Sequence, residues 1–184
     1  LHTLAGDECA HGAVSLPNPL QLVPSGRRVL LPGPNASGKS VYLRTVGTIV
    51  FLAHVGSYVP AESATIGYTD AIYTRMLTRE AALLNVSACM IDLSQTARML
   101  RAATKDSLCL IDEFGKGTSA QDGIAMLYAI LSHLLARDQK CPATLACTHF
   151  TELLGIPELA QHKRLALWAM DVMLTPASAA RGAD

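Results

Sequence analysis

Residues 33–40 read GPNASGKS. It follows the pattern glycine, four residues, glycine, lysine, serine, which is the spacing of a phosphate-binding loop. A triphosphate needs several backbone N–H groups turned inward and a helix whose positive end faces it. Gly33 and Gly38 permit that curl, because glycine adopts backbone dihedrals that are closed to other residues. Lys39 can then reach the outer phosphates, and the Ser40 hydroxyl can ligate a magnesium ion.

The segments on either side of the motif predict the strand and the helix that such a loop requires. Residues 28–31 read RVLL, a short and mostly apolar run typical of a buried strand, and this run ends where the loop begins. Residues 40–55 are largely apolar and contain no proline, which predicts a helix buried on most sides. The alternative is a glycine-rich turn without a ligand, which would not require a strand and a helix at its flanks.

Composition favours a single domain and excludes some functions. The chain has 184 residues, of which 50% are hydrophobic, so it can bury a substantial core. The formal net charge is zero and only 5% of the residues are aromatic, so no basic field or stacking platform indicates nucleic-acid binding. The most apolar segment, residues 41–59, is interrupted by Arg44 and His54, which predicts a core helix and not a membrane span. We therefore expect an intracellular, soluble protein without a membrane partner.

The cysteines predict neither disulfides nor a metal site. There are five of them, with no CxxC pair, so reduced thiols are expected. Cys141, Cys147 and His149 could be considered as metal ligands, but their spacing fits no common zinc pattern.

Strands and helices alternate along the chain, which predicts an α/β domain with a mainly parallel sheet. Residues 1–24 are expected to be loop-like, and residues 175–184 are small and polar, as in a frayed end. In the helix expected from residue 87, the apolar stripe consists of Met90, Leu93, Ala97 and Leu100, and would leave Asp92, Arg98 and Arg101 toward solvent. The expected strands lie near 28–31, 70–74, 107–111 and 143–147, and the expected helices near 39–55, 87–103 and 121–136.

A second motif supplies acidic residues at the end of another apolar strand. Residues 108–113 read LCLIDE, so Asp112 should emerge at the carboxyl end of a buried strand, where open parallel sheets bind ligands. There it can hold magnesium through water, and Glu113 can orient or deprotonate an attacking water. Taken alone, the segment could be a strand that stops at two solvated acids. Combined with the phosphate loop, it predicts nucleotide hydrolysis.

Residues 85–93, NVSACMIDL, indicate a further phosphate contact. Asn85 or Ser87 can cap a helix whose N-terminus is another phosphate-binding position. One domain cannot wrap a triphosphate with both helix ends if these lie on opposite sides of the sheet edge. Two domains facing head to tail can do so.

These motifs, in this order, resemble the MutS family of ATPases, the mismatch-recognition and meiotic recombination proteins. The resembling segments are GPNASGKS, GSYVPAESATIG (56–67), VSACMIDL (86–93), LIDEFGKGTSAQDG (110–123) and CTHFTEL (147–153). The serine before GKS, the MIDLSQ run, and Phe114 with Lys116 are most similar to meiotic members. The resemblance implies a P-loop ATPase domain of the ABC type over residues 25–165, and a tail at 166–184 without family likeness.

The resemblance also implies roles for particular residues. Asp112 would join Ser40 in serving the metal, Glu113 would serve the water, and His149 would sense the γ-phosphate as a switch histidine. Ser87 would reach into a partner's site, while Thr118 and Ser119 would lie in a loop that crosses the dimer. The ATP-binding residues would be Gly33, Pro34, Asn35, Ala36, Ser37, Gly38, Lys39 and Ser40.

The resemblance implies ATP and Mg²⁺ as cofactors, a head-to-tail MutS-family partner subunit, and a nuclear location. DNA contacts would come from mismatch-binding, connector, lever and clamp domains that have no counterpart here, so we expect a fragment or a truncated product. Ala88, Cys89 and Thr45 depart from the family pattern, and we expect hydrolysis to be slow and dimer-dependent.

A mismatch-repair ATPase and an inactive fragment remain as alternatives. A transporter ATPase lacks support because VSACM is not an LSGGQ-like signature, and a cohesion-type ATPase because no sustained heptads occur.

Overall fold

The structure, a computed structural model, describes residues 2–4, 18–20, 28–34, 37–76, 88–116, 118–168 and 170. The predictions for Asn35, Ala36, Ser87 and the end of the tail fall outside these residues. The strands are β1 (His2–Leu4), β2 (Asn18–Leu20), β3 (Arg28–Pro32), β4 (Ile72–Arg75), β5 (Leu108–Asp112), β6 (Ala143–Thr148) and β7 (Leu165–Leu167). The helices are α1 (Lys39–His54), α2 (Ala88–Ala102), α3 (Ala120–Ala136) and α4 (Pro157–Ala160), with 3₁₀ turns η2 (Asp138–Lys140) and η3 (Thr151–Gly155).

Five strands form one sheet in the order β4-β5-β6-β3-β7, and every neighbouring pair is parallel. The predicted α/β class with a parallel sheet is confirmed, and each of the four predicted strands and three predicted helices is present within two residues of its expected bounds. The edge strand β7 was not predicted. It has only three residues, and it exists through its pairing with β3.

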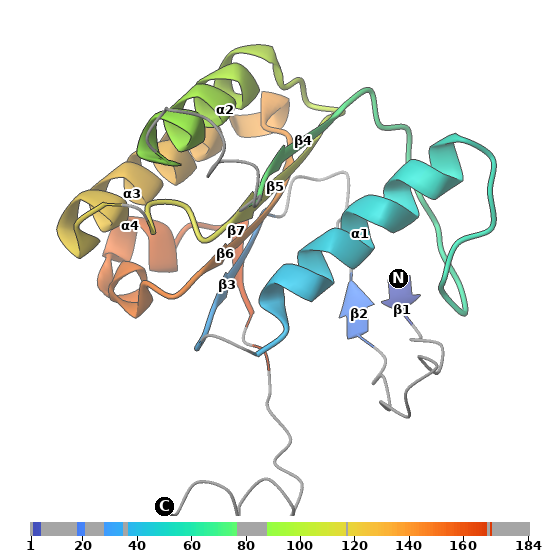
Figure 1. Cartoon of the computed structure of the whole chain (residues 1–184), viewed down its shortest axis with the longest axis horizontal. Helices are drawn as coiled ribbons and strands as arrows, with labels where there is room; N and C mark the ends of the chain where they lie inside the picture. Colours follow the sequence, from blue (N-terminus) through green and yellow to red (C-terminus); the bar gives the residue numbers. More distant parts are fainter. Residues whose placement is uncertain are drawn as a thin grey trace, which may run out of the picture.

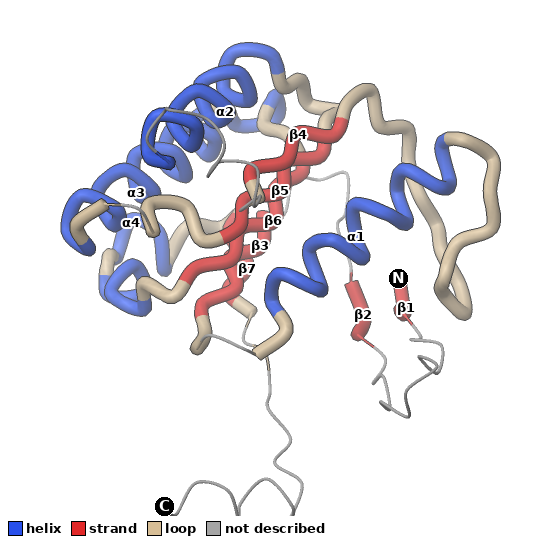
Figure 2. The backbone as a smooth tube through the Cα atoms, in the orientation of Figure 1, coloured by secondary structure: helices blue, strands red, loops and turns tan. Residues whose placement is uncertain are grey.

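Helices cover both faces of the sheet (Figure 1). Successive strand residues point to opposite faces, so Leu30 packs on the α2 and α3 side while Val29 and Leu31 pack on the α1 side. The smooth tube in Figure 2 shows the same three layers, with the helix α1 on one side of the sheet and α2, α3 and α4 on the other. The core therefore consists of two apolar layers, one on each face.

The connections leave the sheet in opposite directions at its centre. The chain after β3 continues into α1 on one face, whereas the chain after the adjacent β6 continues into η3, whose Leu153 is buried on the other face. Adjacent parallel strands whose connections diverge in this way open a crevice at their carboxyl ends, where such sheets bind ligands.

Helix α1 buries one face only, contrary to the prediction that it is buried on most sides. Its long apolar run spans the full circumference, but only one side faces the sheet, so Val41 and Phe51 are exposed. The buried residues of α1 are Lys39, Tyr42, Leu43, Val46 and Ile49.

The predicted orientation of α2 is wrong. Met90 and Leu93, expected in the core, are 53% and 40% exposed, and Asp92, expected in solvent, is 7% exposed. The cause is an ion pair between Asp92 and the buried Arg75 at the end of β4. The buried face of α2 therefore follows Asp92, Thr96 and Met99, while Arg98 and Arg101 are exposed as expected.

Residues 1–24 contain more regular structure than the predicted loop. Strands β1 and β2 pair antiparallel, with Thr3 opposite Pro19.

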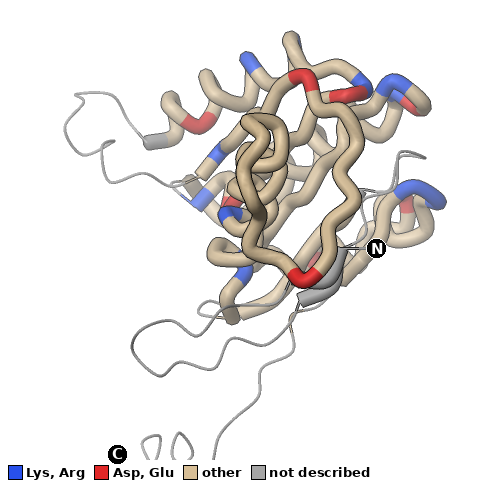
Figure 3. Tube along the Cα trace, turned by 90° about the vertical axis from the view of Figure 1, so that its right-hand side faces the viewer, with Lys and Arg blue, Asp and Glu red and all other residues tan. Residues whose placement is uncertain are grey.

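Across the described residues, no helix is both long and apolar enough to span a membrane. Basic and acidic positions are interspersed in Figure 3, and neither sign gathers on one side in that view.

Candidate nucleotide-binding site

The described part of the phosphate loop is organised around the Lys39 side chain. Its ammonium group donates to the carbonyl oxygens of Gly33 (2.7 Å) and Pro34 (2.5 Å), and lies 3.5 Å from Ser37 Oγ. Lys39 is only 4% exposed, although it is charged. An ammonium whose partners are neutral carbonyls is a strong site for anionic oxygens, because the carbonyls do not cancel its charge.

The loop turns into α1 at Gly38, which has a φ of +85°. A Cβ at Gly38 would meet nothing closer than 3.8 Å, so the constraint is the left-handed backbone and not space. No side chain caps the start of α1 at this residue. The first N–H groups of α1 are thus directed at the loop, where a helix dipole favours phosphate. Ser40, the second residue of α1, is half-buried at the same end.

Backbone hydrogen bonds bring the ends of three strands to one edge. Gly33 donates its N–H to the Thr148 carbonyl (3.2 Å), which joins the loop after β3 to the end of β6. Glu113 donates its N–H to the Cys147 carbonyl (3.0 Å), which joins the end of β5 to β6. The predicted residues Lys39, Asp112 and His149, far apart in sequence, are therefore at adjacent positions on the carboxyl edge.

Asp112 carries a buried oxygen that has no partner. The residue is 4% exposed, and its Oδ1 makes no hydrogen bond. A buried carboxylate oxygen without a partner costs free energy unless a cation or a donor joins it. Oxygen ligands of this kind suit magnesium, so the described residues fit a magnesium site that Asp112 would share with Ser40.

The surroundings of Asp112 exclude water on the sheet side. Cys147, paired with Asp112 in the ladder, donates its Sγ–H to the Lys39 carbonyl (3.8 Å). Burial raises the pKa of the Cys147 thiol far above its usual value, and the Asp112 carboxylate raises it further. The thiol is therefore neutral and acts as packing beneath the site.

Glu113 has an unusual backbone for a non-glycine residue, with a φ of 45°. This conformation costs about 1–3 kcal/mol and persists where surrounding structure imposes it. It turns the chain away from the strand direction directly after Asp112. The Glu113 carboxylate is 15% exposed and pairs with Lys116 Nζ at 2.6 Å.

His149 lies directly after β6 with a buried Nδ1 that has no partner. Its ring stands 4.2 Å from the Phe150 ring, centroid to centroid. A Cβ on Gly123 would come within 2.7 Å of Phe150 Cζ, and one on Gly115 within 2.7 Å of Gly123 Cα. The loop after Glu113, the start of α3 and the His149 segment are thus in direct contact.

The residues predicted to reach a partner are only partly described. Ser119 caps α3: its Oγ accepts from the Asp122 N–H (3.2 Å) and donates to the Asp122 carboxylate (2.6 Å). Thr118 is half-buried and donates its N–H to the Gly115 carbonyl (3.2 Å). Ser87 falls outside the described residues, directly before the first residue of α2.

Sequence reasoning missed Arg75, which is 2% exposed and contacts the backbone of Asp112. Its Nη1 donates to the Asp112 carbonyl (3.0 Å), and its Nη2 pairs with Asp92. The available signal was an arginine directly after the strand predicted at 70–74, next to an edge where other charged groups are predicted.

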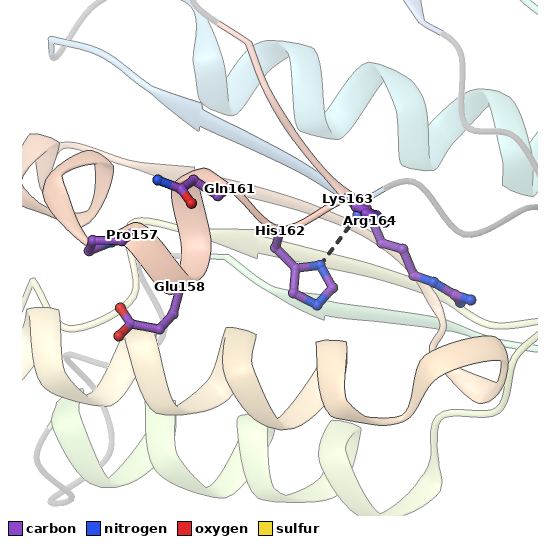
Figure 4. Close-up of a pocket in the computed structure, with 6 residues that line it drawn as sticks. All are labelled: Pro157, Glu158, Gln161, His162, Lys163 and Arg164. Atoms are coloured by element: carbon purple, nitrogen blue, oxygen red, sulfur yellow. Dashed lines mark hydrogen bonds between the residues drawn. The ribbon is translucent and has the colours of Figure 1, made fainter.

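A shallow pocket lies elsewhere on the surface (Figure 4). It is formed by α4 and the turn after it, where His162 Nδ1 accepts from the Arg164 N–H (3.3 Å). Its residues Lys163 and Arg164 come directly before β7, which runs parallel to β3, so they lie near the amino edge of the sheet, opposite the phosphate loop. Its lining residues are Pro157, Glu158, Gln161, His162, Lys163 and Arg164.

A parallel sheet with a lysine-centred loop after β3 and an acidic strand end on β5 defines a P-loop domain of the ATPase type. The family model described as MutS domain V matches residues 29–178. The chain therefore belongs to the MutS family, whose domain V is an ATPase domain. The match continues past residue 165, so the prediction that the tail from 166 lacks family likeness is wrong up to residue 178.

Two curated relatives are similar over most of the chain. MutS protein homolog 5 of Saccharomyces cerevisiae is 42% identical over 151 residues, covering 82% of this chain and 17% of that protein. DNA mismatch repair protein MSH3 of Chaetomium globosum is 46% identical over 135 residues, covering 73% of this chain and 12% of that protein. The chain thus spans less than a fifth of the length of either relative.

Proposed function

We propose that this chain binds ATP with Mg²⁺ at the carboxyl edge of its sheet and hydrolyses it slowly as one half of a head-to-tail dimer. The observation that carries the proposal is the buried, unpartnered Oδ1 of Asp112 at the same edge as the buried ammonium of Lys39. A cation would stabilise the Asp112 Oδ1, and anionic oxygens would stabilise the Lys39 ammonium. Magnesium triphosphate satisfies both.

The proposed roles follow from where each group lies. The N–H groups at the start of α1 and the Lys39 ammonium would hold the phosphates, with Gly33, Pro34, Asn35, Ala36, Ser37, Gly38 and Ser40 completing the loop. Bound Mg²⁺, held by Ser40 and Asp112, would supply charge neutralisation on the phosphates. Glu113 would release Lys116 and orient or deprotonate the attacking water, and His149 would use its unpartnered Nδ1 near the γ-phosphate.

The biological setting is proposed from the relatives. The similarity to MutS protein homolog 5, together with the MIDLSQ run, Phe114 and Lys116, supports a nuclear role in meiotic recombination. The partner would be another MutS-family subunit, the fourth homologue, and the dimer would clamp branched DNA through domains outside this chain. The similarity to DNA mismatch repair protein MSH3 favours a mismatch-repair ATPase as the second candidate.

A substitution at Ser87 tests the head-to-tail arrangement. We expect Ser87→Arg to leave ATP binding by its own subunit intact, because that nucleotide rests on the loop at 33–40. A bulky side chain before α2 would hold the two domains apart and remove helix N–H groups from the partner's γ-phosphate. In a mixed dimer, single-turnover hydrolysis with nucleotide crosslinked to one chosen subunit should show at least about a hundredfold loss at the partner's site.

Ser94→Arg is the matched control, since Ser94 lies exposed on the same helix. It should leave both sites active. If the silenced site belongs to the Ser87→Arg subunit itself, Ser87 acts within its own chain and the head-to-tail arrangement is wrong.

A further inference from the structure

Arg75 joins two parts of the domain that are separate in the sequence. It is the last residue of β4, the edge strand of the sheet, and its guanidinium is buried. One nitrogen, Nη1, donates to the Asp112 carbonyl at 3.0 Å. The other, Nη2, forms an ion pair with Asp92 of α2. Its planar fork thus connects the end of β5 to a helix packed beside it.

The contact with Asp112 is made to its backbone and not to its carboxylate. That carbonyl belongs to the peptide that joins Asp112 to Glu113, directly before the left-handed turn at Glu113. A donor fixed on this oxygen limits rotation of the peptide plane. Arg75 therefore helps set the direction in which both carboxylates leave the backbone.

The contact with Asp92 is made near the start of α2. Asp92 lies four residues, about one turn, after Ala88, where the described part of α2 begins. A displacement of the start of α2 would also displace Asp92. Separating this buried ion pair would leave an uncompensated charge, so the Arg75 guanidinium would move together with Asp92.

The arrangement is not the most stable one available to an arginine, since its buried Nε has no partner. A fully satisfied guanidinium would use this donor as well. The fork bridges the end of β5 and helix α2, and its Nε donor is left without a partner.

Resting on the ATPase function proposed above, we propose that Arg75 is a positioning residue that couples the start of α2 to the Asp112–Glu113 peptide. Binding of nucleotide and metal at Asp112 would then make α2 more ordered. Contact of a neighbouring subunit with α2 would change the orientation of Glu113. The coupling runs through one hydrogen bond and one ion pair, both observed, and requires no other element.

Amide hydrogen exchange tests the coupling without any need for hydrolysis. In the unmodified chain, saturating ATP with Mg²⁺ should slow exchange of the α2 amides at least about fivefold. The reason is that the Arg75 guanidinium links the nucleotide-bound Asp112 segment to the helix, so ordering the first also orders the second. Arg75→Lys keeps the charge but cannot bridge both partners in the same geometry. It should bind ATP within about twofold of the unmodified chain and lose the slowing at α2.

Asp92→Asn is the second variant, and remains informative if Arg75→Lys fails to fold. It should give the same loss, and the double variant should give no further loss, since both changes break one connection. Arg98→Lys, an exposed arginine on α2, is the matched control and should retain the slowing.

The outcomes separate the inference from the function on which it rests. If the unmodified chain does not bind ATP, the proposed function fails and the coupling fails with it. If it binds ATP but α2 exchange does not change, or if both Arg75→Lys and Asp92→Asn keep the slowing, the coupling is wrong while the ATP site stands. If either variant loses ATP binding itself, the residue is part of the binding site and not a positioning residue.

Discussion

Replacing Lys39 by alanine is expected to abolish measurable binding of ATP with magnesium. The ammonium is the buried cation of the described loop, and it donates to the Gly33 and Pro34 carbonyls. Charge-assisted hydrogen bonds to phosphate are each worth about 1.5–3 kcal/mol, so losing two should weaken binding at least about a hundredfold. Equilibrium titration with a fluorescent ATP analogue measures this directly.

Two further variants show whether such a loss is specific. Lys39→Met fills similar space without the charge and should lose binding to the same extent. Lys163→Ala removes an exposed lysine from the pocket edge in Figure 4 and should bind ATP normally. Unchanged ATP affinity in Lys39→Ala would remove the phosphate-loop interpretation.

Replacing Glu113 by glutamine is expected to slow turnover at least about a hundredfold while ATP still binds. Glutamine keeps the shape of the side chain but cannot act as a general base. The ion pair with Lys116 is mostly solvent-facing on the lysine side, so its loss should change stability little. Single-turnover hydrolysis and ATP titration, measured on the same dimer, separate the two effects.

Glu158→Gln, an exposed change on α4, is the matched control and should leave both quantities unchanged. An equal loss of binding and turnover in Glu113→Gln would make Glu113 a metal ligand or a structural residue, and the proposed water-directing role would be wrong.

The sequence predicts the sheet and the edge positions well, because both depend on local pattern. Apolar runs that end at Pro32, Asp112 and Thr148 become parallel strands, and the residues after them necessarily meet at one edge. The order of the strands does not follow from those runs. It places β6 between β3 and β5, and this brings His149 between the phosphate loop and Asp112.

The orientation of α2 could not be predicted from apolar periodicity. Such a pattern assumes that charged residues face water, and it placed Met90 inside and Asp92 outside. A buried arginine reverses the preference, because an ion pair in the interior requires Asp92 to turn inward. The partner, Arg75, is 17 positions earlier on an edge strand, so no local pattern connects the two.

The backbone of Glu113 also lay beyond sequence reasoning. Its φ is positive, and directly after it Gly115 packs closely against Gly123, which packs closely against Phe150. These contacts join three segments that only the folded chain brings together. A sequence pattern can place an acid at the end of a strand, but not the direction in which it points.

The exposure of one side of α1 also could not be predicted from the apolar pattern alone. Val41 and Phe51 belong to an apolar run that predicts burial, and the described sheet can cover only one side of a single helix. The prediction treated hydrophobicity as burial, whereas burial also requires a neighbouring surface.

An equilibrium titration of ATP into the unmodified chain and into Asp112→Asn, each with Mg²⁺ and with a chelator, tests whether this edge of the sheet binds magnesium triphosphate. The unmodified chain should bind one ATP, at least about tenfold more tightly with Mg²⁺, because the metal joins the phosphates to the unpartnered Asp112 oxygen. Asp112→Asn should lose this dependence on Mg²⁺. Absence of saturable binding, or equal affinity with and without Mg²⁺ in the unmodified chain, would contradict a magnesium-triphosphate site at this edge.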